Sequence, residues 1–154
     1  METLIDTSDL EKMKRFPYKW GIRYKKEIDS FYAQGYMKRA GKHHTIQLHR
    51  FILDAPPHLE VDHINHNTLD NRRSQIRLAT RSENEQNKGA RKNSKSGVRG
   101  VHWDKSCKRW RARVYSNKKY VWTGTFEKLE DAIREVEKAR AIYFPFSKEA
   151  RNAN

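Results

Sequence analysis

The stretch VDHINHNTLDNRRSQIRLATRSENEQNK, residues 61–88, decides most of what this sequence predicts. It begins at the end of a short strand and passes through a loop rich in Asp, His, Asn and Arg to a compact apolar strand at 76–79. Thr80 and Glu83 then have the spacing of a capping box, in which each side chain satisfies a free backbone N–H group where a helix starts. The stretch therefore predicts two short strands followed by a helix over 81–88.

Three side chains of this stretch form a candidate catalytic group. The order of strands and helix brings the strand end near Val61 beside the first turns of the helix, where Asn84 lies. Oxygens of Asp62 and Asn84 can then share one hard divalent cation, since such ions prefer oxygen ligands. His63 points to the other side of the strand and can deprotonate a water, because imidazole titrates near neutral pH. On spacing alone, an ordinary surface Asp–His pair is an open alternative.

Residues 48–88, from LHRFIL to ENEQNK, resemble the HNH endonucleases, in the branch whose last motif residue is Asn. The resemblance implies a small ββα-metal (His-Me finger) nuclease unit with His63 as general base and Asp62 and Asn84 as metal ligands. It also implies double-stranded DNA as substrate, one divalent metal (Mg²⁺ expected, Mn²⁺ the alternative) and no small-molecule cofactor. Because members include phage- and intron-encoded homing endonucleases, a homing-type enzyme that nicks DNA is expected.

Two loop positions have roles implied by the same resemblance. Asn71, in LDNRR, matches a recurrent Asn and is expected to brace the loop through backbone hydrogen bonds. Gln75 stands where the family usually has Asn, and its longer side chain is expected to brace the loop carrying His63 more loosely. His49 recurs in the family and is expected to be structural or to lie near a phosphate. The other histidines are expected to be solvated: His43, His44, His58 and His66.

Composition narrows the class of partner. Lys and Arg number 33 against 19 Asp and Glu, a formal net charge of +14 with a pI near 10.0, so a polyanion such as nucleic acid is expected as the partner.

Composition also bears on domain number, disulfides and location. With 36% hydrophobic and 34% charged residues, two small units fit better than one large core. Cys107 is the single cysteine, which excludes an internal disulfide framework and a cysteine-built zinc site. No signal core or membrane span is evident, so we expect a soluble, cytoplasmic protein of a bacterial or phage-infected cell, without a membrane partner. A monomer is favoured, and the sequence leaves the oligomeric state open.

A strongly basic region follows the catalytic stretch. From Lys88 to Trp122 there are twelve Lys or Arg and one acid, Asp104. The segment KGARKNSKSG at 88–97 has the small, polar, basic composition of a linker. Beyond it VRGVHW, RWRARVY and KYVWTGTF predict three strands, and apolar residues at helical spacing predict a helix over 128–143. Acidic side chains on that helix would repel phosphate, so the helix is expected to back the sheet.

Alternation along the strands assigns the faces of this sheet. The basic face is expected to carry Arg109, Arg111, Arg113 and Tyr115, joined by Tyr120 and Trp122. The apolar face is expected to carry Trp110, Ala112 and Val114, joined by Val121 and Thr123. A merely solvated basic face is the alternative, but aromatic residues among the arginines favour DNA binding.

SGVRGVHW, KRWRARV and VWTGTF, followed by an amphipathic helix, resemble the Apetala/ethylene-response-factor DNA-binding domain over 95–144. That family reads the major groove with a three-stranded sheet and also occurs fused to HNH nucleases. By matching position, the resemblance implies DNA contacts from Arg99, His102, Arg113, Tyr115 and Trp122. Three of these positions carry residues unusual for the family, so the preferred DNA sequence of the plant domain does not transfer.

Together the patterns predict an α+β protein, with short strands at 18–24, 31–39 and 45–49 and a short helix at 48–55 before the catalytic stretch. The expected domains are an HNH nuclease (1–88), a basic linker (89–94), and a three-stranded antiparallel sheet packed on one helix (95–154). A metal-dependent DNA endonuclease is the leading hypothesis. A non-catalytic, sequence-specific DNA-binding regulator with a degenerate HNH scaffold is the alternative, favoured by Gln75. RNA binding is disfavoured, because no single-strand stacking motif accompanies the basic face.

Overall fold

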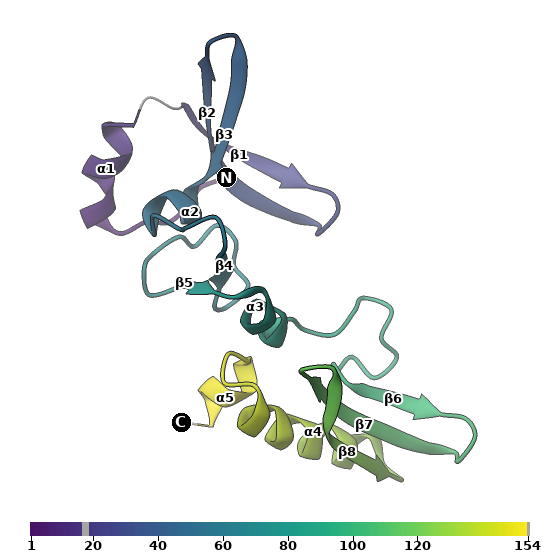
Figure 1. Cartoon of the computed structure of the whole chain (residues 1–154). Helices are drawn as coiled ribbons and strands as arrows, with labels where there is room; N and C mark the ends of the chain where they lie inside the picture. The colour runs from purple at the N-terminus through teal and green to yellow at the C-terminus, as the bar shows by residue number, and fades with distance from the viewer. Residues whose placement is uncertain (17–18, 154) are drawn as a thin grey trace. The chain divides into compact units, whose positions relative to one another are not determined.

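The computed structural model of the protein describes residues 1–16 and 19–153. Small sheets and a few helices confirm the mixed α and β class (Figure 1). The chain divides into two compact units, Met1–Asn84 and Glu85–Asn154, and the division falls within helix α3. The two units are described separately below.

The first unit opens with short helices and a three-stranded antiparallel sheet. The sheet has the order β1-β2-β3, with β1 at Lys19–Lys25, β2 at Ser30–Arg39 and β3 at Lys42–Gln47. The helices η1 (Thr7–Asp9) and α1 (Leu10–Lys14) precede it. Neither helix was predicted, because their sequence has no long apolar periodicity.

The three predicted strands of this region have counterparts with shifted ends. Tyr18, the predicted first residue of the first strand, lies outside the described residues. The third strand was predicted at 45–49 but ends at Gln47, because helix α2 (Leu48–Ile52) begins at the next residue. The prediction of a short helix from Leu48 is confirmed, although it ends before 55.

The core of the first unit forms around α2. The residues Leu48, Phe51 and Ile52 lie on one helical face at spacings of three and four, and all three are buried. The ring of Phe51 packs against those of Phe16 and Trp20, with centroids 4.2 and 5.3 Å apart. This packing attaches α2 to strand β1 and to the segment that follows α1.

Residues 60–87 fold into a hairpin followed by a helix. Strand β4 (Glu60–His63) pairs antiparallel with β5 (Ile76–Ala79), and α3 (Arg81–Asn87) follows directly. The predicted strand at 76–79 is confirmed, and the predicted helix ends one residue early. Ile76 is buried in the same cluster as α2, so the hairpin is fixed to the core of the unit.

The second unit is a three-stranded antiparallel sheet with helix α4 along one face (Figure 1). Its elements are β6 (Val101–Asp104), β7 (Arg109–Ser116), β8 (Lys119–Phe126), α4 (Leu129–Tyr143) and α5 (Lys148–Asn152). Ala112 and Val114 of β7 are buried against Ala132 and Val136 of α4, which confirms that the helix backs the sheet. Helix α5 was not predicted.

Strand β6 starts three residues later than predicted because of Gly100. This residue has φ of +87°, a conformation that favours glycine, and its carbonyl accepts the N–H of Arg113. A Cβ at this position would collide with the backbone of Arg113. The chain therefore turns at Gly100 before it becomes a regular strand at Val101.

The predicted faces of β8 are wrong at two positions. Trp122 is paired with Val114 and packs against the core, so it lies on the apolar face, and Thr123 is paired with Arg113 on the basic face. A shift in the pairing between Val114 and Tyr115 causes this error, because the extra residue reverses the alternation that a regular strand would keep. Tyr120, which lies beyond the shift and is paired with Tyr115, is on the predicted face.

No helix within the described ranges is both long enough and apolar enough to cross a membrane.

Candidate active site

The first turn of helix α3 contacts strand β4. The capping box is confirmed: the Thr80 N–H donates to the Glu83 carboxylate at 2.7 Å, and the Glu83 N–H donates to the Thr80 hydroxyl at 3.3 Å. Asn84 follows, and its Nδ2 donates to the carboxylate of Glu60 in β4. Asn84 therefore faces the side of β4 that carries Glu60.

Asp62 lies on that same side of β4, because residues two apart in a strand point the same way. It is buried, and its Oδ2 accepts hydrogen bonds from Arg77, directly opposite in β5, at 2.9 Å from Nε and 2.8 Å from Nη2. The two expected oxygen ligands, Asp62 and Asn84, thus belong to one side of the hairpin. Glu60 adds a third oxygen-bearing side chain there.

The donor atoms on this side suit a hard divalent cation, since carboxylate and amide oxygens are its preferred protein ligands. Asn84 turns its Nδ2 towards Glu60, so its amide oxygen is directed elsewhere and can bind a cation. Arg77 already pairs with Asp62, and a cation would have to share that carboxylate or displace the guanidinium. Across residues 1–16 and 19–153 no cluster of three His, Cys, Asp or Glu could hold a metal.

His63, on the opposite side of β4, is buried and held by Asn71. Its Nε2 lies 3.2 Å from Oδ1 of Asn71, which is fully buried. An amide oxygen only accepts hydrogen bonds, so Nε2 donates and the lone pair of the neutral ring is on Nδ1. Burial lowers the pKa of His63, and the hydrogen bond to Asn71 acts in the opposite direction. A neutral imidazole with a defined basic nitrogen is what a general base requires.

Two aromatic rings enclose His63. The His49 ring lies edge-on to it with centroids 4.9 Å apart, and the Tyr32 ring of β2 lies 6.0 Å from it. Burial lowers the pKa of His49 to about 3. His49 therefore stays uncharged near neutral pH and adds no positive charge beside His63.

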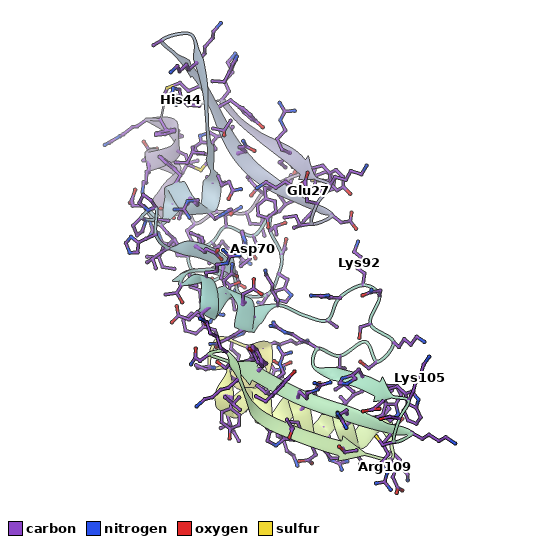
Figure 2. The ribbon with its side chains drawn as sticks, turned by 45° about the vertical axis from the view of Figure 1, so that its right-hand side comes forward. Glu27, His44, Asp70, Lys92, Lys105 and Arg109 are labelled. Atoms are coloured by element: carbon purple, nitrogen blue, oxygen red, sulfur yellow. The ribbon has the colours of Figure 1, made fainter. Side chains whose placement is uncertain are left out.

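The loop between β4 and β5 is closed by Gln75. The Gln75 carbonyl accepts the N–H of Ile64 at 2.9 Å, and its side-chain oxygen accepts Nδ2 of Asn65 at 2.7 Å. Within the loop, Asp70 accepts two hydrogen bonds from Arg72, and Figure 2 labels Asp70 beside the hairpin. The glutamine thus connects both ends of the loop that follows His63.

The basic face of the second unit carries the three expected arginines of β7, but two have acidic partners. Arg109 pairs with Glu127 at 2.9 Å and Arg111 with Asp104 at 3.1 Å. Figure 2 shows Arg109 near Lys105, at the turn between β6 and β7. The Arg109–Glu127 pair is exposed and costs little to open in water, and Arg111 is itself partly exposed, so both arginines are within reach of an anion.

Arg113 has a different environment, because its guanidinium forms hydrogen bonds with two uncharged groups. Its Nη2 lies 2.6 Å from Nε2 of His102, and its Nη1 donates to the Tyr120 hydroxyl at 3.0 Å. Burial and the charge of Arg113 lower the pKa of His102, so the imidazole is neutral and accepts this hydrogen bond. With Tyr115 beside Tyr120, these residues make a compact Arg–His–Tyr cluster on the basic face.

Arg99 is not on the sheet. It precedes β6, and its Nη1 donates to the carbonyls of Glu85 and Lys88, the latter at 3.0 Å. Its guanidinium thus donates to carbonyls at the C-terminal end of α3, where few backbone donors remain. Of the five residues expected at DNA by position, the structure groups His102, Arg113 and Tyr115 on one face and places Trp122 on the other. Arg99, although off the sheet, lines the same pocket as the first three.

Three residues of the site were missed in the sequence. Glu60 could have been found from its spacing of two from Asp62, and Arg77 from the hairpin pairing that places it opposite Asp62. Thr3, whose hydroxyl accepts Nδ2 of Asn71 at 2.8 Å, gives no sequence signal, because it is distant in the chain.

The comparisons with known proteins concern the hairpin and helix. The HNH endonuclease family matches residues 54–86, which include β4, β5 and most of α3. An uncharacterized HNH endonuclease of Acanthamoeba polyphaga mimivirus is 45% identical over 62 residues, covering 36% of this chain and 33% of the relative. The chain thus matches about a third of that relative's length. No solved structure matches the chain. The two matches support an endonuclease.

Proposed function

We propose that this protein is a metal-dependent endonuclease of the HNH type that nicks double-stranded DNA. The observation that carries the proposal is the arrangement in β4 and α3. Asp62 and Asn84 lie on one side of the hairpin, while His63 is buried on the other with its Nε2 committed to Asn71. The HNH family match over 54–86 contains all four residues.

The proposed chemistry assigns one task to each side chain. His63 accepts a proton at Nδ1 from a water, which attacks the phosphorus as the bond to the leaving oxygen breaks. Asn71 keeps the imidazole oriented, and Gln75 holds the loop closed. The uncharged His49 ring excludes water from one edge of the base.

The proposed metal is Mg²⁺, with Mn²⁺ as a substitute, and the residues that would hold it are Asp62 and Asn84. A bound divalent ion supplies stabilisation of negative charge on the phosphate and the leaving oxygen. Arg77 orients the Asp62 carboxylate through two hydrogen bonds to one oxygen.

We further propose that the second unit is a DNA-binding domain of the Apetala/ethylene-response-factor type, joined to the nuclease by the basic linker at 89–94. Support comes from its three-stranded antiparallel sheet backed by α4 and from the arginines exposed on the other face. The proposed contacts are Arg109, Arg111, Arg113, His102 and Tyr115. Arginine on a sheet in the major groove can donate two hydrogen bonds to guanine.

One observation favours a second candidate, a DNA-binding regulator without catalysis. The carboxylate of Asp62 pairs with Arg77 at 2.8 Å, so its charge is balanced without a cation. An Arg77→Gln variant separates the two candidates. If the protein is an enzyme, Arg77→Gln should bind Mg²⁺ at least as tightly as the wild type does. If it is a regulator, neither the wild type nor the variant should bind Mg²⁺.

The proposal is tested with supercoiled plasmid and the His63→Ala variant. The wild-type protein should convert the plasmid to nicked circles, and the variant should be slower by about 10²–10⁴-fold, the usual contribution of a general base. DNA affinity in a gel-shift assay should stay within a few-fold, because His63 acts on water. Equal loss of binding and cutting would exclude the assigned role.

A further inference from the structure

Residues 3–9 bind the loop that follows His63, and we call them the strap. Leu4 pairs with the loop through its backbone: its N–H donates to the Leu69 carbonyl, and its carbonyl accepts the N–H of Asn71, both at 2.8 Å. At the other end of the strap, the buried Asp9 accepts hydrogen bonds from Arg73 at 2.7 and 3.0 Å. The strap is therefore fixed to the loop at both ends.

One side chain of the strap reaches the candidate base through Asn71. The Thr3 hydroxyl donates its single hydrogen to the carbonyl of Leu69 at 2.8 Å. Having used that hydrogen, the oxygen can only accept from Asn71, whose Nδ2 lies 2.8 Å away. The amide of Asn71 must then present Oδ1 to His63, as observed.

The direction of this chain of hydrogen bonds determines which nitrogen of His63 carries the proton. If the Asn71 amide were inverted, its Nδ2 would donate to Nε2 of His63. The neutral ring would then have its proton on Nδ1 and could not accept one there. The Thr3 hydroxyl distinguishes the two amide orientations, because a backbone carbonyl fixes the position of its hydrogen.

We propose that Thr3 is a positioning residue that holds His63 with the proton on Nε2 and the lone pair on Nδ1. This inference rests on the proposed function only in one respect, which is that Nδ1 accepts a proton from the attacking water. The tautomer itself is a property of the protein alone and can be measured without metal or DNA.

The test compares Thr3→Val with Thr3→Ser in the full chain labelled with ¹⁵N-histidine. Valine has nearly the shape of threonine but lacks the hydroxyl, whereas serine keeps it. Long-range ¹H–¹⁵N NMR at pH 8, without metal, should show the Nε2–H form of His63 in the wild type and in Thr3→Ser. In Thr3→Val a substantial fraction of the Nδ1–H form should appear.

A matched control is Thr68→Val, because Thr68 lies in the same loop and its hydroxyl donates to the Phe31 carbonyl. It should leave the His63 tautomer unchanged. If Thr3→Val keeps the pure Nε2–H form, or if Thr68→Val changes it equally, the proposal is overturned. Should Thr3→Val not fold, Thr3→Ala provides the same comparison, since the backbone pairing of Leu4 needs no side chain.

Nicking kinetics give the second readout. We expect Thr3→Val to lower kcat about tenfold, part of the 10²–10⁴-fold that a general base contributes, with KM unchanged. Thr3→Ser should restore the rate. If Thr3→Val changes the tautomer but the wild-type protein does not nick DNA, the role of Thr3 is supported and the proposed function is refuted. If Thr3→Val changes the tautomer but nicks DNA at the wild-type rate, the assignment of Nδ1 as the proton acceptor is refuted.

Discussion

Acidification is expected to destabilise the first unit through His49. Burial lowers the pKa of this residue from 6.5 to about 3. Below pH 6.5 the unfolded chain binds a proton at His49 and the folded chain does not, so stability is retained above 6.5 and lost as the pH falls. At about 1.4 kcal/mol per pKa unit, His49 should remove about 2 kcal/mol of unfolding free energy at pH 5. His63, whose pKa is also lowered by burial, acts in the same direction.

Urea unfolding at pH 7 and pH 5 measures this loss. Trp20 packs on Phe51 in the core around α2, so a 5-fluorotryptophan label at Trp20 reports the first unit by ¹⁹F NMR. The His49→Leu variant cannot bind the proton. Between the two pH values it should lose about 2 kcal/mol less than the wild type.

The exposed histidine His44, which Figure 2 labels in β3, provides the control. His44→Leu should leave the pH dependence of stability close to that of the wild type. If His49→Leu loses as much stability on acidification as the wild type does, then His49 is protonated in the folded protein. Our conclusion that an uncharged His49 ring lies beside His63 would then be wrong.

Three further predictions concern metal, product and DNA. Asp62→Asn should weaken Mg²⁺ binding at least tenfold by calorimetry, because a charged ligand is removed; unchanged affinity would place the metal elsewhere. One HNH centre addresses one phosphodiester at a time, so a nicked circle should precede any linear plasmid, and concerted linearisation by a demonstrated monomer would contradict this. Replacing Arg109 and Arg111 with Gln should reduce the salt dependence of DNA binding. The slope of log affinity against log salt concentration should fall by about one unit for each phosphate that the protein no longer neutralises. A slope equal to that of the wild type would show that this face does not bind phosphate.

The local structure around the site was predictable, because its signals lie within a short stretch. The capping box fixed the start of α3, and alternation in β4 separated Asp62 from His63. Alternation likewise predicted which residues of β7 are buried. These patterns depend only on neighbours in sequence.

Contacts between distant residues were not predictable in the same way. The bond from Asn71 to Thr3 spans 68 residues, and nothing near Thr3 marks it as part of a site. The reversed faces of Trp122 and Thr123 follow from one irregular pairing between β7 and β8, which strand periodicity does not reveal. Similarly, the contact of Arg99 with the end of α3 was not predicted, because it depends on tertiary packing.

The most direct test of the central claim is a plasmid assay with controlled metal. Purified wild-type protein is incubated with supercoiled DNA in Mg²⁺, in excess chelator, and in chelator followed by restored Mg²⁺, with His63→Ala treated identically. We predict nicked circles with Mg²⁺, none in chelator, recovery when Mg²⁺ is restored, and little product from the variant under any condition. Undiminished nicking in excess chelator, or equal nicking by His63→Ala, would contradict a metal-dependent endonuclease that uses His63 as its base.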